Sequence, residues 1–153
     1  IIMPELEADD AMGIYATENP GNIIVSPDKD MRQIPGRLYN MDETTMVTPT
    51  EGAKWHLIQT LAGDQTDGYS GVPGIGVKRA VTLFDQDGYS WETVVKAFEN
   101  KGLTEEDALT NARLAKILTN EDYDRVKKWF IPWTPTAGFR IDDGTELQNE
   151  KAR

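Results

Sequence analysis

Apolar and polar residues follow one another along the chain in short blocks, which predict several short helices and strands. Apolar residues at helical spacing predict helices over 5–17, 49–62, 89–100, 104–118 and 121–130, and another from about Lys78. Continuous or alternating apolar runs predict a strand over 22–26, buried on both faces, and a hairpin of strands over 37–41 and 45–48. The pattern therefore predicts a mixed α/β fold.

The helix over 49–62 has the most specific boundaries. Thr48 to Glu51 (TPTE) reads as a capping box with proline at the first helical position. Gly63 reads as the C-cap glycine. Trp55, Ile58 and Leu61 or Ala62 fall on one face of this helix.

Composition limits the chemistry that the chain can carry. Its 153 residues suit one domain with an appendage, and the absence of cysteine excludes disulfides and thiolate metal sites. The single histidine, His56, is interpreted as a packing or surface residue, so a metal site would consist mainly of oxygen ligands. No apolar run reaches the ~20 residues of a membrane span, which predicts a cytoplasmic protein without membrane contact.

The net charge of −10, from 26 acidic and 16 basic residues, argues at first against a nucleic-acid partner. A site for divalent ions, however, needs clustered carboxylates, and bound ions reverse the local sign of the charge. The net charge therefore leaves a metal-dependent nucleic-acid protein open.

Carboxylates gather in three stretches, EADD, SPDKD and GDQTD. The second follows the predicted strand over 22–26, and open α/β sheets bind ligands beyond the carboxyl ends of their strands. Taken singly, the stretches are also compatible with a solvated helix start or an ordinary polar turn. The acidic residues concerned are Glu7, Asp9, Asp10, Asp28, Asp30, Asp64 and Asp67.

A glycine-rich loop, GYSGVPGIGVK, precedes the basic helix that starts near Lys78. Glycines let backbone amides approach a phosphate, and amides at a helix start bind anions without side chains. A purely structural loop is the alternative. The candidate contact residues are Gly71, Val72, Gly74, Ile75, Gly76, Lys78 and Arg79.

The order EADD, SPDKD, GDQTD and GVPGIGVKRA resembles the 5′ nuclease superfamily, which includes flap endonucleases, the 5′ nuclease domain of bacterial DNA polymerase I and phage 5′-to-3′ exonucleases. Within it, the chain is similar to the double-strand-specific exonucleases of short-tailed phages, through MRQIPGRLYN and the region after Tyr89. The resemblance covers roughly residues 5 to 130 and has three acidic motifs and one loop motif in the family's order.

The resemblance implies a partial parallel sheet with flanking helices (PIN/5′ nuclease-like) over 1–48, a helix-three-turn-helix and helical subdomain over 49–133, and an extension over 134–153 that ends in a mobile tail. It also implies that the seven acids are catalytic and hold two Mg²⁺ ions, with Mn²⁺ as the substitute. The glycine loop would contact DNA, with K⁺ as a further candidate cation there.

Two features depart from the family. Gly68 stands where members usually have asparagine after G-D-x-x-D. An earlier strand with its aspartates and the helical arch do not precede Ile1, so we expect a carboxy-terminal portion that lacks the amino-terminal part of the active site. The missing nuclease segment is then an expected partner, on another chain or lost by truncation.

Three functions are consistent with the sequence. The first is a metal-dependent 5′-to-3′ exonuclease that hydrolyses phosphodiesters of duplex DNA from a 5′ end in phage replication or recombination. A flap endonuclease is a variant of this first function. The second function is a duplex-DNA-binding module without catalysis. The third is an acidic metal-binding domain unrelated to DNA, which unchanged DNA affinity after charge reversal at Lys78 and Arg79 would favour.

Overall fold

The computed structural model describes residues 6–19, 21–124, 126–127 and 129–141, and the chain divides into two compact units. The first contains Ile1–Gly52 and Ile117–Pro132, and the second contains Ala53–Lys116 and Trp133–Arg153. The predicted division into a nuclease core, a helical subdomain and an extension stays a prediction. The predicted tail, 144–153, lies outside the described residues. Within the described part, every helix is too short or too polar to span a membrane.

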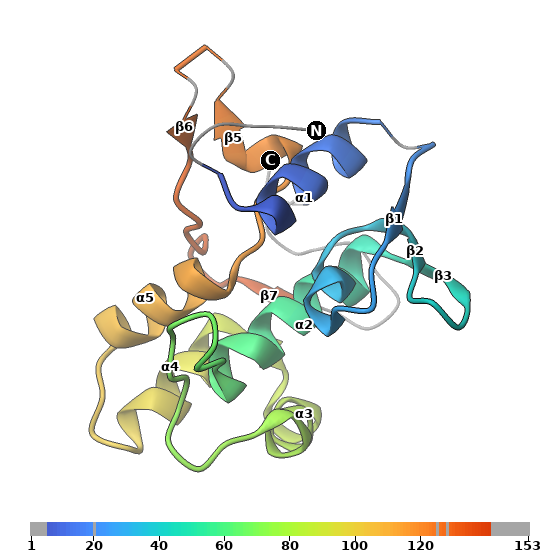
Figure 1. The fold of residues 1–153 in the computed structure, drawn as a ribbon. Coiled ribbons are helices and arrows are strands. Elements are labelled where there is room, and N and C mark those ends of the chain that lie inside the picture. The colour runs from blue at the N-terminus through green and yellow to red at the C-terminus, as the bar shows by residue number, and fades with distance from the viewer. Residues whose placement is uncertain (1–5, 20, 125, 128, 142–153) are drawn as a thin grey trace. The chain divides into compact units, whose positions relative to one another are not determined.

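The first unit is built on a three-stranded sheet in the order β1-β2-β3 (Figure 1). β1 runs parallel to β2, and β2 and β3 form the predicted antiparallel hairpin. Buried Ile24, Met31, Ile34 and Leu38 form the centre of its core. Its elements are α1 (Ala8–Glu18), β1 (Ile23–Val25), the 3₁₀ helix η1 (Lys29–Gln33), β2 (Gly36–Tyr39), β3 (Thr44–Val47), the 3₁₀ helix η2 (Asn120–Asp122), β5 (Tyr123–Asp124) and β6 (Trp129–Phe130).

The prediction that the first strand is buried on both faces is wrong. Ile24 is buried, but Ile23 and Val25 are 48% and 55% exposed. Successive side chains of a strand point to opposite faces. Ile24 therefore faces the core, whereas Ile23 and Val25 face away from it.

The predicted helix over 121–130 is also wrong, because the described residues there form η2 and the antiparallel pair β5 and β6. Asp124 Oδ1 accepts hydrogen bonds from the backbone N–H groups of Val126 (2.9 Å) and Lys127 (3.1 Å). An aspartate that bonds to the amides two and three positions ahead favours a turn over a helix interior. Trp129 and Phe130 are aromatic residues of high strand propensity.

The second unit consists of helices and one small sheet. α2 (Pro49–Ala62) has its first turn in the first unit and the rest in the second. It starts at the predicted capping box, in which the Thr48 N–H donates to Glu51 Oε1 (3.0 Å) and the Glu51 N–H donates to Thr48 Oγ1 (3.1 Å). Gly63, with φ of +72°, follows its last turn as predicted. The remaining elements are α3 (Val77–Asp87), β4 (Tyr89–Ser90), α4 (Trp91–Glu99), α5 (Glu105–Ala115) and β7 (Arg140–Ile141).

Tertiary packing joins β7 to the core of the second unit. β7 pairs with β4, and Phe139 and Ile141 are buried in the core with Leu61, Phe84 and Phe98. The predicted extension over 134–153 therefore contains a strand, β7. The pairing of β4 with β7 joins residues that are far apart in the sequence, so no local pattern indicates it.

His56 is a packing residue, as predicted. It is buried, and its Nε2 lies 2.8 Å from the Ala112 carbonyl oxygen. Because a carbonyl only accepts, Nε2 carries the proton and donates this bond. The imidazole also contacts the edge of the Trp133 ring, with 4.9 Å between ring centroids.

Candidate functional site

Three carboxylates of the first unit converge beyond the carboxyl end of β1. Asp9 lies in the first turn of α1, Asp28 is the N-cap of η1, and Asp30 lies inside η1. Asp28 Oδ1 accepts the Asp30 N–H at 2.9 Å, which fixes both residues to one backbone turn. One carboxylate oxygen from each of the three lies within 4.8 Å of the other two. We call this group the Asp9 cluster.

The electrostatics of the Asp9 cluster are those of crowded like charges. Burial raises the pKa of Asp9, and the negative charges of Asp28, Asp30, Asp10 and Glu7 raise it further. Both causes disfavour the ionised carboxylate. A bound cation would remove this penalty, since it pairs with the ionised form.

Lys29 lies beside the cluster and supplies one positive charge. Its Nζ is 3.2 Å from Asp30 Oδ1, and the lysine side chain remains largely exposed whereas that of Asp30 is buried. A flexible, exposed lysine gives little net stabilisation. Lys29 therefore offsets part of the repulsion among three carboxylates and leaves an excess of negative charge.

Glu7 and Asp10 occupy different positions from Asp9. Glu7 is the exposed N-cap of α1 and makes no side-chain cap hydrogen bond. Asp10 Oδ1 accepts the backbone N–H of Leu118 at 3.0 Å, which ties α1 to the segment that follows α5 in sequence. Of the acidic stretch at the start of α1, Asp9 is the member that joins the Asp9 cluster.

The donor set suits a hard divalent cation. Mg²⁺ and Ca²⁺ prefer oxygen ligands, and Mg²⁺ commonly binds one or two carboxylates and keeps several waters. Soft ions prefer thiolate, which this chain lacks. The residues present therefore fit the divalent ion that the sequence predicts.

Asp64 and Asp67 lie in the second unit, in the loop after α2. The backbones of Asp64 and Tyr69 pair in both directions, at 2.8 and 3.2 Å. Asp64 Oδ1 accepts the N–H groups of Thr66 (2.9 Å) and Asp67 (3.3 Å). Asp64 thus shapes the turn, and Asp67 is exposed on it. The metal-binding role of both residues stays a prediction.

The first part of the glycine loop, at Gly71 and Val72, packs against the end of α2. Gly63 and Gly71 both have positive φ, +72° and +63°, and a Cβ on either would collide with backbone atoms across the loop. The Gly71 N–H donates to Asn111 Oδ1 at 2.8 Å, and the Val72 N–H donates to the Leu61 carbonyl at 2.8 Å. These amides are occupied inside the protein, and Gly71 and Val72 are buried.

The second part of the loop is open. A Cβ at Gly74 or Gly76 would meet nothing within 4 Å, and both residues are exposed. Gly76 is the N-cap of α3, and no side chain caps this helix. Lys78 and Arg79 are exposed in its first turn, whereas Ile75 is half-buried. Of the predicted contact residues, these open positions are the ones an anion could reach directly.

Asn111 is the functional position that the sequence did not indicate. It lies on α5 and holds the glycine loop from a distance of 40 residues along the chain. Its side-chain N–H also donates to the Asp107 carbonyl at 2.9 Å, which orients the amide. The residues on either side of Asn111 in the sequence do not distinguish it from a solvent-exposed asparagine on a helix.

Known proteins with similar sequences are nucleases. The chain is 31% identical to the exodeoxyribonuclease of Enterobacteria phage T3 over 88% of its own length and 57% of that protein. It is 30% identical to the exonuclease of Escherichia phage T7 over 86% of the chain and 57% of the relative. It is 32% identical to a 5′-3′ exonuclease of Mycobacterium tuberculosis over 80% and 46%.

The chain thus spans a little over half the length of these phage relatives. No protein-family model matches it. The similarity extends over most of the chain.

Proposed function

The chain belongs to the 5′ nuclease superfamily, and on this basis we propose that it is part of a metal-dependent 5′-to-3′ exonuclease acting on duplex DNA. The observation that carries the proposal is the Asp9 cluster, in which three carboxylate oxygens lie within 4.8 Å of one another. The names of the relatives give the direction of attack and the class of polymer. Replication or recombination of phage DNA is the proposed setting.

Asp9, Asp28 and Asp30 would hold the divalent cation, Mg²⁺ or Mn²⁺. A bound divalent cation lowers the pKa of its water and stabilises charge on a phosphoryl group. The protein's own contribution is to hold the carboxylates in place, which the Asp28 to Asp30 hydrogen bond at 2.9 Å supports. Asp64 and Asp67 are proposed as further ligands because of their motif, GDQTD.

The open part of the glycine loop would bind the DNA backbone. Uncapped amides at the start of α3 offer donors to a phosphate oxygen, and the positive end of the helix dipole favours the anion. Lys78 and Arg79 would add charge-assisted contacts. Contacts to phosphate position a duplex and read no base sequence, in keeping with an exonuclease that degrades any sequence. K⁺ is a candidate ion at this loop.

The relatives are longer than this chain, so we also propose that an amino-terminal nuclease segment completes the active site. The test uses 5′-labelled duplex DNA with Mg²⁺, incubated with the chain alone and with the amino-terminal part of the T7 relative added. We expect release of 5′ nucleotides that Asp28→Asn abolishes and Asp42→Asn leaves intact. Asp42 is an exposed acid of the β2–β3 turn outside the Asp9 cluster.

A second candidate function is duplex-DNA binding without cleavage. It is favoured by the position of the whole glycine loop, its support by Asn111 and the basic start of α3 within one unit. DNA binding with no nucleotide release in either mixture, at saturating Mg²⁺ and Mn²⁺, would establish this function and exclude the exonuclease. Preference for a 5′ flap over a flush end in the same assay would indicate a flap endonuclease instead.

A further inference from the structure

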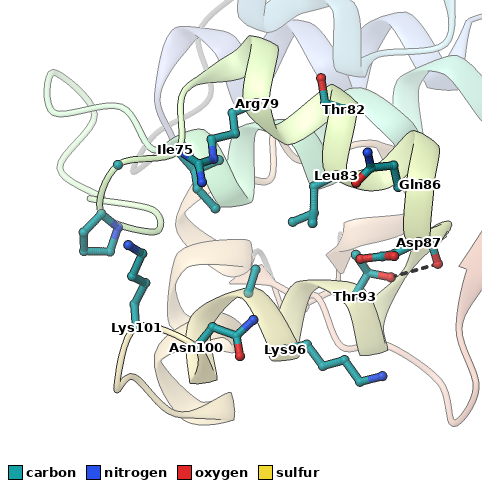
Figure 2. Close-up of a pocket in the computed structure, with 13 residues that line it drawn as sticks. Ile75, Arg79, Thr82, Leu83, Gln86, Asp87, Thr93, Lys96, Asn100 and Lys101 are labelled. Carbon is teal, nitrogen blue, oxygen red and sulfur yellow. Dashed lines mark hydrogen bonds between the residues drawn. The ribbon is translucent and has the colours of Figure 1, made fainter.

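A groove between α3 and α4 lies in the second unit, beside the open part of the glycine loop. Its volume is about 390 Å³, within the ~300–1,000 Å³ typical of ligand pockets. Figure 2 shows Arg79 and Leu83 of α3 on one side, with Asn100 and Lys101, which follow α4, on the other. The proposed nuclease function gives the groove itself no role.

The groove is basic although the chain is acidic. Three cationic residues and one acidic residue are among its described lining residues, on a chain whose net charge is −10. Arg79 and Lys101 lie at one end, and Asp87 lies at the other (Figure 2). Within the described part of the chain no salt bridge engages Arg79 or Lys101, whereas Lys96 Nζ pairs with Glu92 Oε1 at 3.0 Å. One end of the groove therefore offers two cations to the anionic groups of a ligand.

The surface next to these cations is aliphatic. Ile75, Leu83 and Ala97 contribute to the lining, and Leu83 is half-buried, so a ligand can cover its exposed part. Covering apolar surface favours binding. Gln86 and Asn100 are exposed and add amide groups to the lining. Amides both donate and accept, which suits the N–H and C=O groups of a peptide backbone.

Two features of the groove favour an acidic peptide over a nucleic-acid strand. Sites for single strands stack bases on aromatic side chains, and none of the described residues that line the groove is aromatic. A strand that follows the groove would also carry its phosphates past Asp87, where like charges repel. A peptide can place carboxylates at one end only and an aliphatic side chain beside them.

We propose that this groove binds a short acidic peptide segment of a partner protein. Two carboxylates of the peptide lie at Arg79 and Lys101, and one aliphatic side chain packs on Leu83 and Ala97. Clustered cations recognise acidic motifs through charge-assisted hydrogen bonds. The inference goes beyond the nuclease function and does not depend on it, because every lining residue belongs to the second unit.

The test measures the binding of fluorescein-labelled synthetic peptides by fluorescence anisotropy. The probe is EEEEL, four glutamates followed by leucine, while QQQQL lacks the side-chain charges and EEEEG lacks the aliphatic side chain. For the wild-type chain we expect EEEEL to bind at least about tenfold more tightly than QQQQL and about fivefold more tightly than EEEEG. Lys101→Gln should weaken the binding of EEEEL about tenfold, and Lys101→Glu should abolish it.

Lys96→Gln is the matched control, since it removes the same charge from the groove lining at a residue already paired with Glu92. It should bind EEEEL within about twofold of the wild type, because an exposed paired lysine contributes little. Lys101 is exposed beyond the end of α4, so its variants should melt at the wild-type temperature.

No binding of EEEEL, equal binding of EEEEL and QQQQL, or binding that Lys101→Gln leaves unchanged would each overturn the proposal. Lys101-dependent binding of oligothymidylate without binding of EEEEL would also overturn it and identify a nucleic-acid site. Lys101-dependent self-association without binding of EEEEL would do the same and identify a second copy as the occupant.

The outcomes also separate the groove from the proposed function. A chain that binds duplex DNA but not EEEEL would overturn the groove proposal and leave the proposed function standing. A chain that binds EEEEL through Lys101 but binds no duplex would support the groove proposal and contradict the proposed function.

Discussion

Replacing Asp9 by asparagine tests the Asp9 cluster with little change in side-chain volume. Burial and then the charges of Asp28 and Asp30 raise the pKa of Asp9, so the folded protein disfavours its ionised form. The folded protein therefore binds more protons than the unfolded chain as pH passes between the unfolded and folded pKa values. Stability falls as pH rises through that window, and the penalty is fully present above the folded pKa. Asp9→Asn should thus stabilise the metal-free protein.

The size of this effect follows from the geometry. Carboxylate oxygens within 4.8 Å of one another repel by roughly 1 kcal/mol per pair in water and about 3.5 kcal/mol at an effective dielectric constant of 20. Asp9 is half-buried and still in contact with solvent, so we use the lower figure, and two neighbours give about 2 kcal/mol. The dipole of α1 stabilises an acid in its first turn by ~0.3–1 kcal/mol. The net gain is about 1 kcal/mol, or a rise in Tm of ~2–4 °C.

The assay is thermal unfolding in EDTA and in MgCl₂ for wild type, Asp9→Asn and the control Asp42→Asn. Magnesium at ten times its Kd should stabilise the wild type by about 1.4 kcal/mol. Asp9→Asn should start at a higher Tm in EDTA and gain less from magnesium, whereas Asp42→Asn should follow the wild type. If Asp9→Asn had a lower Tm than the wild type in EDTA, the view that this cluster is a strained metal site would be refuted. The same holds if Asp9→Asn gained as much stability from magnesium as the wild type does.

Three more predictions concern the second unit. In an anisotropy titration, Lys78→Gln and Arg79→Gln should each weaken duplex binding and reduce the slope of log K against log salt by about 1. Unchanged slopes would exclude both residues as phosphate contacts. Gly71→Ala should lower the free energy of unfolding in urea by more than ~2 kcal/mol, because the new Cβ collides with backbone atoms. Gly74→Ala should cost about 1 kcal/mol, because φ is positive there but the space around it is open. Equal losses would contradict the division of the loop into an enclosed and an open part. Asn111→Leu should cost ~1–3 kcal/mol because the buried Gly71 N–H loses its acceptor, and a neutral effect in the same urea assay would show that water replaces it.

The sequence predicted the starts of α2 and α5 well because their signals are local. The bonds between Thr48 and Glu51 join residues three positions apart, and the same holds for Thr104 and Asp107 at the start of α5. Donor, acceptor and helix start are then all visible in one short string. The hairpin of β2 and β3 is predictable for the same reason, since its partners flank one turn.

Predictions failed where a local pattern was compatible with two structures. The stretch after Glu121 contains apolar residues at helical spacing, but Asp124 stabilises a turn and the aromatic residues 129 and 130 pair with 123 and 124. Likewise, three successive apolar residues in β1 do not show whether one or both faces are covered. Burial depends on neighbouring elements, and the string IIV contains no information about them.

Within the site, neighbouring residues of one motif have different roles, which only tertiary structure can separate. Asp9 and Asp10 are adjacent, yet about 100° of helical rotation directs Asp9 to the carboxylates after β1 and Asp10 to the Leu118 amide, 108 residues away. Gly71 and Gly74 belong to one loop, yet Gly71 is enclosed by α2 and α5 while Gly74 is open. A motif therefore identifies the place of the chemistry, and the contacts decide which of its residues bind a ligand and which support the backbone. Substitution of Asp10 or Gly71 should accordingly act mainly by reducing the stability of the fold. Substitution of Asp9 or Gly74 should act mainly by reducing ligand binding.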